Sequence, residues 1–346
     1  MTVPGTDKSL DLLDRMLADL DEAPEIYQPT VFWRSGMASI MKDLREHGVA
    51  SFRRHPSATA FYVPTYLERS AAAQSLETFL RSVGRVELVT RVTNRHLARY
   101  DHAVATELDP PGAPHLEEAS ESGYGEPLEQ FEFDGKKYSR SFLNYLRGLV
   151  LFKRTVPDAD LRTVLEIGGG YGTLGEVLLP RNPTMRFVDV DIPPVGFVAT
   201  WYLRAVLGAN QVAGYDTTRD MKRISFDRLP PATVLCSWQL PRLEGTVDLF
   251  VNFISFQEME PHVVENYVDQ VTRLGARYVL LRNSTTGKPV RAENGRGVGV
   301  NEPVVRDSYL RMFDGYELIA SDHVLFGHVT EGGLTSEVMI LRKTGV

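Results

Sequence analysis

Hydrophobic residues in the first part of the chain recur at the spacing of helices. Residues 9–20 carry leucines three or four positions apart, which places them on one helical face. The segments 32–48 and 70–84 have similar patterns, and each reaches a glycine, a common helix terminator. Residues 139–156 repeat the pattern. We therefore expect a mainly helical region over residues 1–156.

The pattern changes after residue 156, where short apolar runs alternate with helical segments. Runs rich in β-branched and aromatic residues predict strands over residues 163–167, 186–190, 247–253 and 277–283, with helices over 195–208 and 261–275. Such alternation is typical of a doubly wound, mostly parallel sheet. Two last runs, 316–322 and 335–343, have no full helix between them and predict an antiparallel edge hairpin. The predicted fold class is α/β, with a Rossmann-like sheet over residues 157–346.

A glycine cluster follows the first predicted strand and opens a helix. It consists of Gly168, Gly169, Gly170 and Gly172. Glycine permits a sharp turn and lets a ligand approach the backbone, while the helix start offers free N–H groups. A P-loop is disfavoured, because no Lys-Ser/Thr pair follows the last glycine. Spacing alone leaves a dinucleotide site open, since Gly170, Gly172 and Gly175 match the G-x-G-x-x-G fingerprint.

Two acidic residues distinguish between these kinds of site. Glu166 ends the strand two residues before the first glycine, where its carboxylate would repel the pyrophosphate of NAD. The same carboxylate suits a cofactor with a cationic amino-acid end. Asp191 lies about 20 residues after the glycines, at the end of the next strand, where an acid can accept hydrogen bonds from ribose hydroxyls. Glu166, the glycine loop and Asp191 together predict a site for S-adenosylmethionine.

The stretch VLEIGGGYGTLGEVLL, followed by VDIPP, closely resembles the class I S-adenosylmethionine-dependent methyltransferases. More narrowly, residues 120–345 look like the family of sugar O-methyltransferases. Tyr267 and four stretches carry this likeness: ESGYGEP (121–127), YSRSFLNYLR (138–147), VNFISFQEME (251–260) and VLLRNS (279–284). The resemblance implies a class I methyltransferase sheet, S-adenosyl-L-methionine as the cofactor and methyl transfer to a small molecule.

The resemblance also implies which residues contact the cofactor. The methionine end should be surrounded by Glu166, Gly168, Gly170 and Tyr171, with Gly169 in the same loop. Asp191 should hold the ribose, and Ile192 should lie against the adenine. The adenine edge should meet the end of another strand, either near Asp216 or at Ser237, Trp238 and Gln239. We prefer the second, because the strand at 247–253 follows it directly.

Polar residues that could act on a methyl acceptor follow the strand at 247–253. They are Asn252, Ser255, Gln257, Glu258, Glu260 and His262. The carboxyl end of a strand beside the cofactor loop is where ligands of α/β sheets bind. We name Glu258, Glu260 and His262 as candidate catalytic residues, and place Asn252 beside the cofactor. Glu258 and Glu260 could grip a planar guanidinium by bidentate hydrogen bonds, although Glu260 could instead cap the helix that starts at Pro261.

Further residues are expected to line a substrate pocket. Ser255, Gln257, Glu258 and Tyr267 belong to this set, with Tyr124, Tyr145 and Arg147 from the helical region. Tyrosines at helical spacing also suit a packed core. The helical region should cover the pocket or form a dimer contact. The glycine-rich loop 284–303 is expected to be a mobile lid or a surface loop.

Composition narrows the classes of function. The formal net charge of −7 argues against nucleic-acid binding, and no apolar run reaches the ~20 residues of a membrane span. The single cysteine, Cys236, excludes an internal disulfide, and the N-terminus lacks signal-peptide features, so we expect a cytoplasmic protein. Scattered histidines give no metal motif. We expect a small-molecule substrate and a homodimer.

Three functions remain open from the sequence. The first is O-methylation of a sugar or glycosylated metabolite, possible in natural-product biosynthesis. The second is N-methylation of a small cationic metabolite, such as the guanidine of free arginine, which the acidic pair and the net charge favour. The third is S-adenosylmethionine binding without catalysis, against which the intact glycine loop and ribose acid argue.

Overall fold

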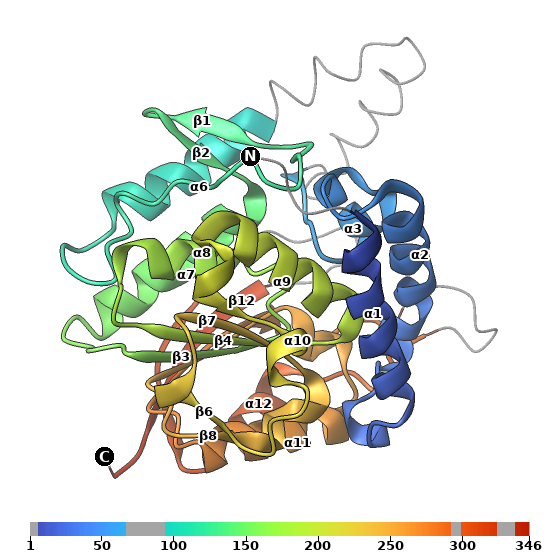
Figure 1. The fold of residues 1–346 in the computed structure, drawn as a ribbon. Helices are drawn as coiled ribbons and strands as arrows, with labels where there is room; N and C mark the ends of the chain where they lie inside the picture. The colour runs from blue at the N-terminus through green and yellow to red at the C-terminus, as the bar shows by residue number, and fades with distance from the viewer. Residues whose placement is uncertain (1–5, 67–93, 292–298, 324–335, 346) are drawn as a thin grey trace.

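A sheet of eight strands forms the centre of the computed structural model, which describes residues 6–66, 94–291, 299–323 and 336–345 (Figure 1). Its strands lie in the order β11-β12-β10-β9-β3-β4-β7-β5. In chain order they are β3 (Thr163–Ile167), β4 (Arg186–Asp191), β5 (Val212–Ala213), β7 (Ala232–Cys236), β9 (Leu249–Phe253), β10 (Tyr278–Ser284), β11 (Tyr316–Asp322) and β12 (Ser336–Lys343). The predicted helix over 70–84 lies outside the described residues.

Strand directions confirm the predicted fold class. The six neighbouring strands β10, β9, β3, β4, β7 and β5 pair in parallel, while β12 runs antiparallel to both β10 and β11. β11 and β12 therefore form the antiparallel edge hairpin that the last two apolar runs predict. Parallel pairing brings the carboxyl ends of β3, β4, β7 and β9 to one edge of the sheet, where ligands of such sheets bind.

Helices cover both faces of the sheet (Figure 1). One face is covered by α7 (Arg140–Thr155), α8 (Thr173–Leu178) and α9 (Pro193–Leu207), the other by α11 (Pro261–Arg273) and α12 (Arg306–Met312). Successive strand residues enter different cores, because side chains alternate across a strand. Val164 packs in the cluster of Phe142 from α7, whereas Leu165 packs in the cluster of Val264 from α11.

The N-terminal helices stand along one side of this sandwich (Figure 1). They are α1 (Thr6–Asp21), α2 (Val31–His47) and α3 (Pro56–Phe61), joined by the short turns η1 (Glu25–Tyr27) and η2 (Phe52–Arg54). α6 (Arg95–Glu107) follows, and then a small hairpin of β1 (Phe131–Phe133) and β2 (Lys136–Tyr138). The predicted mainly helical region missed this hairpin, because its strands are only three residues long and carry little periodicity.

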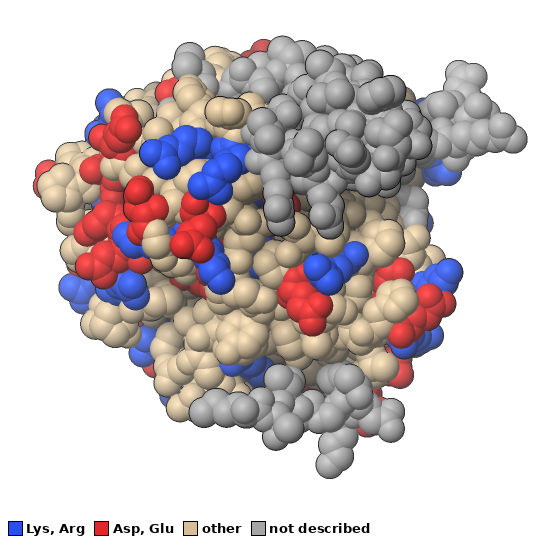
Figure 2. Space-filling view, turned by 90° about the horizontal axis from the view of Figure 1, so that it is seen from above, with Lys and Arg blue, Asp and Glu red and all other residues tan. Residues whose placement is uncertain are grey.

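Short elements complete the connections. They are α10 (Tyr215–Thr218), β6 (Ile224–Ser225), β8 (Leu243–Glu244), η5 (Leu179–Arg181), η6 (Ala209–Gln211), η7 (Phe226–Arg228), η8 (Ser237–Arg242) and η9 (Ser255–Glu258). Within the described ranges, no helix has both the length and the apolar character needed to cross a bilayer. The face shown in Figure 2 carries acidic and basic side chains beside one another.

Helix α7 approaches the sheet closely through Gly148. A Cβ atom on this glycine would lie 2.4 Å from Cζ of Phe253, the last residue of β9. One turn earlier, the Tyr145 ring stacks on the Phe253 ring with centroids 4.9 Å apart and an interplanar angle of 6°. A small residue at 148 therefore lets the helix rest on Phe253 at the edge of the sheet where the site is built.

We predict that Gly148→Ala destabilises the protein. Alanine favours a helix over glycine by about 1 kcal/mol, but overpacking against Phe253 costs about 1–3 kcal/mol. Since Phe253 is pinned by the stacked Tyr145 ring, the overpacking should dominate and lower the free energy of unfolding by up to roughly 2 kcal/mol. Urea unfolding measures this; a variant more stable than the parent would show that Phe253 can move aside.

Candidate active site

The glycine loop between β3 and α8 has a backbone path that residues with a side chain rarely adopt. Gly168, Gly170 and Gly172 have φ values of 72°, 66° and 90°, in the left-handed region. A Cβ on Gly168 would lie 2.1 Å from the Ser255 hydroxyl oxygen. A Cβ on Gly169 would lie 2.6 Å from a carboxylate oxygen of Glu166. The loop is therefore pressed against polar side chains on its inner side, and its outer side faces a cavity.

This cavity has a volume of about 370 Å³ and lies at the carboxyl edge of the sheet. Gly168, Gly169, Gly170, Tyr171 and Thr173 form one wall, next to Asp191 and Ile192 from the end of β4. An aromatic group on α2 and α3, Phe32, Trp33 and Phe61, lines it from the N-terminal side. These three rings contact one another with centroids 5.9–6.3 Å apart. The aromatic wall carries no periodic signal that separates it from core, so the sequence did not identify it.

Asp191 is held in place by the backbone around it. One carboxylate oxygen accepts a hydrogen bond from the Gly170 N–H at 3.1 Å, and the other accepts one from the Ile192 N–H at 2.7 Å. The side chain lines the cavity beside the glycine loop. An ionised carboxylate has about four acceptor positions, so Asp191 can accept further hydrogen bonds from a ligand. The structure thus brings the predicted ribose acid and glycine loop to the same cavity.

Glu166 lies elsewhere than the sequence suggested. It is fully buried behind the glycine loop and does not line the cavity. The Tyr145 hydroxyl donates a 2.7 Å hydrogen bond to its Oε1 atom, while its Oε2 atom has no hydrogen-bond partner among the described residues. Tyr145 does line the cavity. Glu166 thus reaches the cavity wall through the Tyr145 hydroxyl, whose hydrogen bond it accepts.

One face of α7 supplies polar groups to the cavity. Arg140, Ser141, Asn144 and Tyr145 line it, and their spacing of one and four residues places them on one side of the helix. The Asn144 side chain is 3% exposed, and its Oδ1 atom has no hydrogen-bond partner among the described residues. Sequence reasoning missed Arg140, Ser141 and Asn144. Their shared helical face with Tyr145 was the signal that could have found them.

Buried acids around the loop have raised pKa values. Burial raises the pKa of Glu166 to about 8, although the Tyr145 hydrogen bond opposes the change. Burial raises the pKa of Asp191 to about 7 against the two backbone N–H groups that it accepts. Asp189, which accepts the Gly169 N–H at 3.2 Å, also has a strongly raised pKa because of its burial and the nearby Glu166. Three carboxyl groups are thus buried close together around one loop, and burial favours the protonated form of each.

The candidate catalytic segment is η9, which follows β9. Ser255, Gln257 and Glu258 all line the cavity, as does Tyr267 of α11. The residue before them, Ile254, has φ 74° and ψ −40°, a strained conformation for a β-branched side chain. It also lines the cavity. Strained residues of this kind concentrate at functional sites, so the turn after β9 agrees with the expected position of the acceptor.

Glu258 forms an ion pair that the sequence did not predict. Its Oε1 atom lies 3.1 Å from Nζ of Lys288, and the two side chains are 6% and 21% exposed. The ammonium group also lies 4.8 Å from the centroid of the Phe32 ring, within cation–π range. Lys288 belongs to the predicted lid or surface loop 284–303. Residues 292–298 of that loop lie outside the described residues.

Several predicted catalytic and substrate residues do not line the cavity. His262 is exposed in the first turn of α11. Glu260 is buried at the N-cap of α11 but makes no side-chain capping bond, and its Oε1 atom has no hydrogen-bond partner among the described residues. Tyr124 is 45% exposed at the surface. Arg147 is buried against Asp101, with which it forms an ion pair. The spacing of these four residues along the sequence does not show which way each side chain points, because that depends on how the chain folds around them.

Asn252 acts as a brace and lies outside the cavity lining. Its amide nitrogen donates to the Ile167 carbonyl at 2.9 Å and to the Ser255 hydroxyl at 2.6 Å. Its Oδ1 atom accepts from Asn283 at 3.1 Å and from the Phe256 N–H at 3.3 Å. Asn252, which we expected beside the cofactor, thus connects β3, η9 and β10 by hydrogen bonds.

The preferred adenine-edge strand has the expected neighbour, but its side chains are engaged elsewhere. β7 pairs directly with β4, placing Cys236 opposite Asp191, whereas β5 lies beyond β7 and Asp216 pairs with Arg204. None of the three residues after β7 lines the cavity. Ser237 donates to the Tyr27 carbonyl, Trp238 packs edge-on against Tyr215, and Gln239 bonds Cys236 and Thr218. These contacts with η1 and α10 hold the three side chains away from the cavity.

Metal coordination has no counterpart in the described part of the chain, where no three His, Cys, Asp or Glu side chains are grouped as ligands. Sequence comparison gives no protein family and no curated protein that matches. Among solved structures, magnesium protoporphyrin IX methyltransferase from Synechocystis PCC 6803 is similar at 12% identity and a TM-score of 0.37, over 60% of this chain and 86% of that chain.

Two further solved structures show a comparable likeness. The mitomycin 7-O-methyltransferase MmcR is 12% identical with a TM-score of 0.37, over 99% of this chain and 74% of that chain. The pyocyanin biosynthetic protein PhzM is 11% identical with a TM-score of 0.36, over 58% of each chain. With a likeness at this level, the functional inference rests on the residues of the site.

Glu166 and Asp191 predict a stability that falls with pH. Their pKa values of about 8 and about 7 mean that the folded chain keeps protons which the unfolded chain releases near 4.5 and 3.8. The free energy of unfolding should therefore decrease as the pH rises from about 4 to about 8. Asp189 and Glu176, whose pKa values are also raised, act in the same direction. Urea unfolding in a pH series measures the slope.

Glu166→Gln is the matched variant for this experiment. Glutamine keeps an acceptor oxygen for the Tyr145 hydroxyl and removes one titrating group. Its free energy of unfolding should depend less steeply on pH than that of the parent. An equal slope in parent and variant would show that folding does not change the protonation of Glu166 over this range.

Proposed function

We propose that this chain is a class I S-adenosylmethionine-dependent methyltransferase that acts on a small molecule. The observation that supports this most directly is the shared cavity: the glycine loop, Asp191 and Glu258 all line it. The loop supplies a surface without side chains, and Asp191 supplies an acceptor fixed by two backbone N–H groups. Glu258, a carboxylate that also lines the cavity, can receive a proton from an acceptor.

The residues present fit the cofactor at each of its ends. Asp191 would accept hydrogen bonds from ribose hydroxyls, and Ile192 and Tyr267 offer apolar surface for the adenine. Asn144 would accept from the ammonium of the amino-acid end through its Oδ1 atom. Arg140, which lines the cavity on the same helical face, would attract the carboxylate. When bound, S-adenosylmethionine supplies a methyl group on an activated sulfonium.

Glu258 and Lys288 suit a hydroxyl acceptor. A hydroxyl oxygen becomes a nucleophile as it loses its proton, and Glu258 can take that proton and pass it to solvent. Lys288, 3.1 Å from Glu258, lowers the cost of negative charge on an oxygen bound beside it. The aromatic group Phe32, Trp33 and Phe61 would hold the body of the substrate. We therefore favour O-methylation, with a sugar or glycosylated metabolite as the family resemblance implies.

N-methylation of a cationic guanidine finds less support. That hypothesis needs Glu258 and Glu260 together, but Glu260 does not line the cavity. Glu258 already pairs with a cation, Lys288, which a guanidinium would have to displace. A cytoplasmic location and a role in biosynthesis remain proposals from the sequence, in which Cys236 is the single cysteine and is buried and free in the structure. A homodimer remains a proposal based on the size of the N-terminal region.

Calorimetry with S-adenosylmethionine and its demethylated product, S-adenosylhomocysteine, tests the cofactor assignment. We expect micromolar affinity for both. Asp191→Asn keeps the shape of the side chain but removes its charge, and should weaken binding by roughly 1–3 kcal/mol, the cost of a lost charge-assisted hydrogen bond. Absence of heat at high micromolar ligand would overturn the assignment.

Methylthioadenosine, which lacks the amino-acid end, separates the two halves of the site. Asp191→Asn should weaken its binding as much as that of S-adenosylhomocysteine. Asn144→Leu should weaken S-adenosylhomocysteine alone, since the Asn144 Oδ1 atom would face the missing ammonium. An equal loss for both ligands in Asn144→Leu would assign Asn144 a general structural role.

Glu258→Gln tests the acceptor end. A positioned base contributes typically about 10²–10⁴-fold, so turnover should fall within about that range while the affinity for S-adenosylhomocysteine stays within about twofold of the parent. A neutral hydroxyl substrate should keep its KM, whereas a cationic substrate should lose affinity as well. Assays use labelled cofactor with a panel of sugars, glycosides, arginine and amines. Full turnover by the variant on the true substrate would exclude Glu258 as the base.

A further inference from the structure

A buried ion pair joins the N-terminal region to the residues beside the glycine loop. Arg53 of η2 and Glu121 are 0% and 2% exposed, and their Nη2 and Oε1 atoms lie 2.7 Å apart. The backbone adds a second connection, because the Arg53 N–H donates to the Gly125 carbonyl at 2.9 Å. Glu121 and Gly125 belong to the stretch ESGYGEP, whose role the proposed chemistry does not explain. Burying two charges is costly, so the arrangement calls for compensating contacts.

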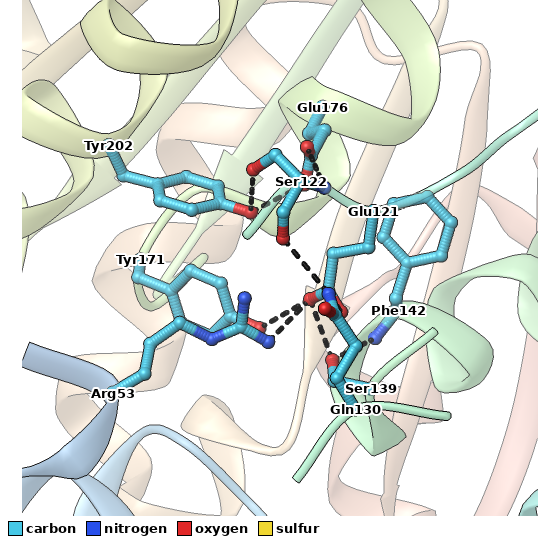
Figure 3. A network of polar contacts seen from close by, with 9 residues as sticks. All are labelled: Arg53, Glu121, Ser122, Gln130, Ser139, Phe142, Tyr171, Glu176 and Tyr202. Carbon is cyan, nitrogen blue, oxygen red and sulfur yellow. Dashed lines mark hydrogen bonds and ion pairs between the residues drawn. The ribbon is translucent and has the colours of Figure 1, made fainter. Parts of the chain in front are cut away.

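Glu121 gathers those contacts and includes Tyr171 among them (Figure 3). Its Oε1 atom accepts from Arg53, from the Ser139 hydroxyl at 2.7 Å and from the Tyr171 hydroxyl at 3.2 Å. Its Oε2 atom accepts from Gln130 at 3.1 Å. The Arg53 guanidinium also lies 5.1 Å from the centroid of the Tyr171 ring. The Tyr171 side chain is therefore held at its hydroxyl and over its ring.

The neighbouring Ser122 extends the network to α8, the helix that follows the glycine loop. The Ser122 N–H donates to Glu176 at 2.7 Å, and the Tyr202 hydroxyl donates to the other Glu176 oxygen at 2.5 Å (Figure 3). The Tyr171 ring packs edge-on against the Tyr202 ring, with centroids 5.1 Å apart. Tyr171, at the end of the glycine loop, and Glu176, in the helix that follows, are therefore both held by contacts with residues outside the loop.

The position of Tyr171 gives this network a consequence for the cavity. Tyr171 lies between Gly170, whose N–H contacts Asp191, and Gly172, whose φ is 90°. Ordering the backbone of a residue costs about 1–2 kcal/mol, and the loss is largest for glycine. A loop that is already ordered before a ligand binds avoids that cost at binding. Tyr171 is the one residue of the run 168–172 with a side chain, so it adds side-chain contacts to the backbone hydrogen bonds that Asp189 and Asp191 accept from the loop.

We propose that Glu121 and Arg53 are positioning residues for the cofactor: they hold Tyr171, and through it the glycine loop, in the conformation that binds. This inference rests on the proposed function for the identity of the ligand. The N-terminal turn η2 and the ESGYGEP stretch thereby set the affinity of a site to which neither Arg53 nor Glu121 contributes a lining group.

A double-mutant cycle on cofactor affinity tests the inference. Glu121→Gln removes the charge, and Tyr171→Phe removes the hydroxyl while keeping the ring. Each should weaken S-adenosylhomocysteine binding about tenfold, equivalent to about 1.4 kcal/mol. Because both changes break the same connection, the double variant should bind about as weakly as either single one. Calorimetry is done at a temperature well below the thermal unfolding midpoint of every variant, so that a smaller folded fraction does not lower the measured affinity.

Hydrogen exchange of the amides at 168–172 gives a readout that needs no ligand. Glu121→Gln should speed exchange there and leave the amides of β10 unchanged. Glu118→Gln is the matched control, because Glu118 lies three residues before Glu121 and forms an exposed ion pair with Arg181. This change should alter neither the affinity nor the exchange of the loop amides. If Glu121→Gln does not fold, Arg53→Met with Glu121→Gln removes both charges together and takes its place in the cycle.

The outcomes separate this inference from the proposed function. A parent protein that does not bind S-adenosylhomocysteine refutes the function, while loop exchange still decides whether Glu121 orders the glycines. Parent-like affinity in Glu121→Gln, or losses that add in the double variant, would overturn the positioning role. Unchanged loop exchange in Glu121→Gln would overturn it as well.

Discussion

The contact between the glycine loop and the side chains behind it is the constraint on which the rest of the site depends. Glu166, Asp189 and Ser255 press against the loop so closely that a Cβ on Gly168 or Gly169 would overlap them. Because the inner side is filled in this way, the outer side of the loop presents bare backbone to the cavity. Asp191 is positioned by the same loop, through the Gly170 N–H. The close packing of this loop therefore determines both the bare backbone that lines the cavity and the position of the Asp191 carboxylate.

This arrangement requires the fold to bury acidic groups that would be more stable in water. Their raised pKa values record that cost, with burial as the largest contribution at Glu166, Asp189 and Asp191. Tyr145 and backbone N–H groups compensate part of it. The N-terminal region adds a second buried cluster around Arg53 and Glu121. These hydrogen-bonded polar groups favour the loop arrangement that keeps their bonds, because breaking a buried hydrogen bond is costly.

The side of the cavity that we propose for the acceptor differs in character from the side that we propose for the cofactor. It combines the aromatic group Phe32, Trp33 and Phe61 with the ion pair of Glu258 and Lys288. The strained Ile254 turn directs η9 into this space from the end of β9. A carboxylate with a lysine beside it suits proton removal from a hydroxyl better than capture of a guanidinium, for which a second carboxylate would have to reach the cavity. Glu260 is buried at the α11 N-cap instead.

The sequence by itself determined the sheet, its antiparallel edge and the position of the glycine loop. Period-two and period-3.6 patterns are local, and the turn after β3 needs glycine at neighbouring positions, so short windows contain this information. Asp191 could be placed because parallel strands end at one edge.

Only the tertiary structure decided which polar groups reach the cavity. Glu166 is buried behind the loop and hydrogen-bonds Tyr145, which lines the cavity as expected, because α7 packs closely at the strand end, with Gly148 allowing the close contact. Lys288 reaches Glu258 across 30 positions, and Arg53 reaches Glu121 across 68. Ser237, Trp238 and Gln239 are withdrawn because η1 and α10 pack against them. Contacts of such separation depend on how helices are stacked around the sheet, and hydrophobic periodicity specifies a buried face without specifying its partner.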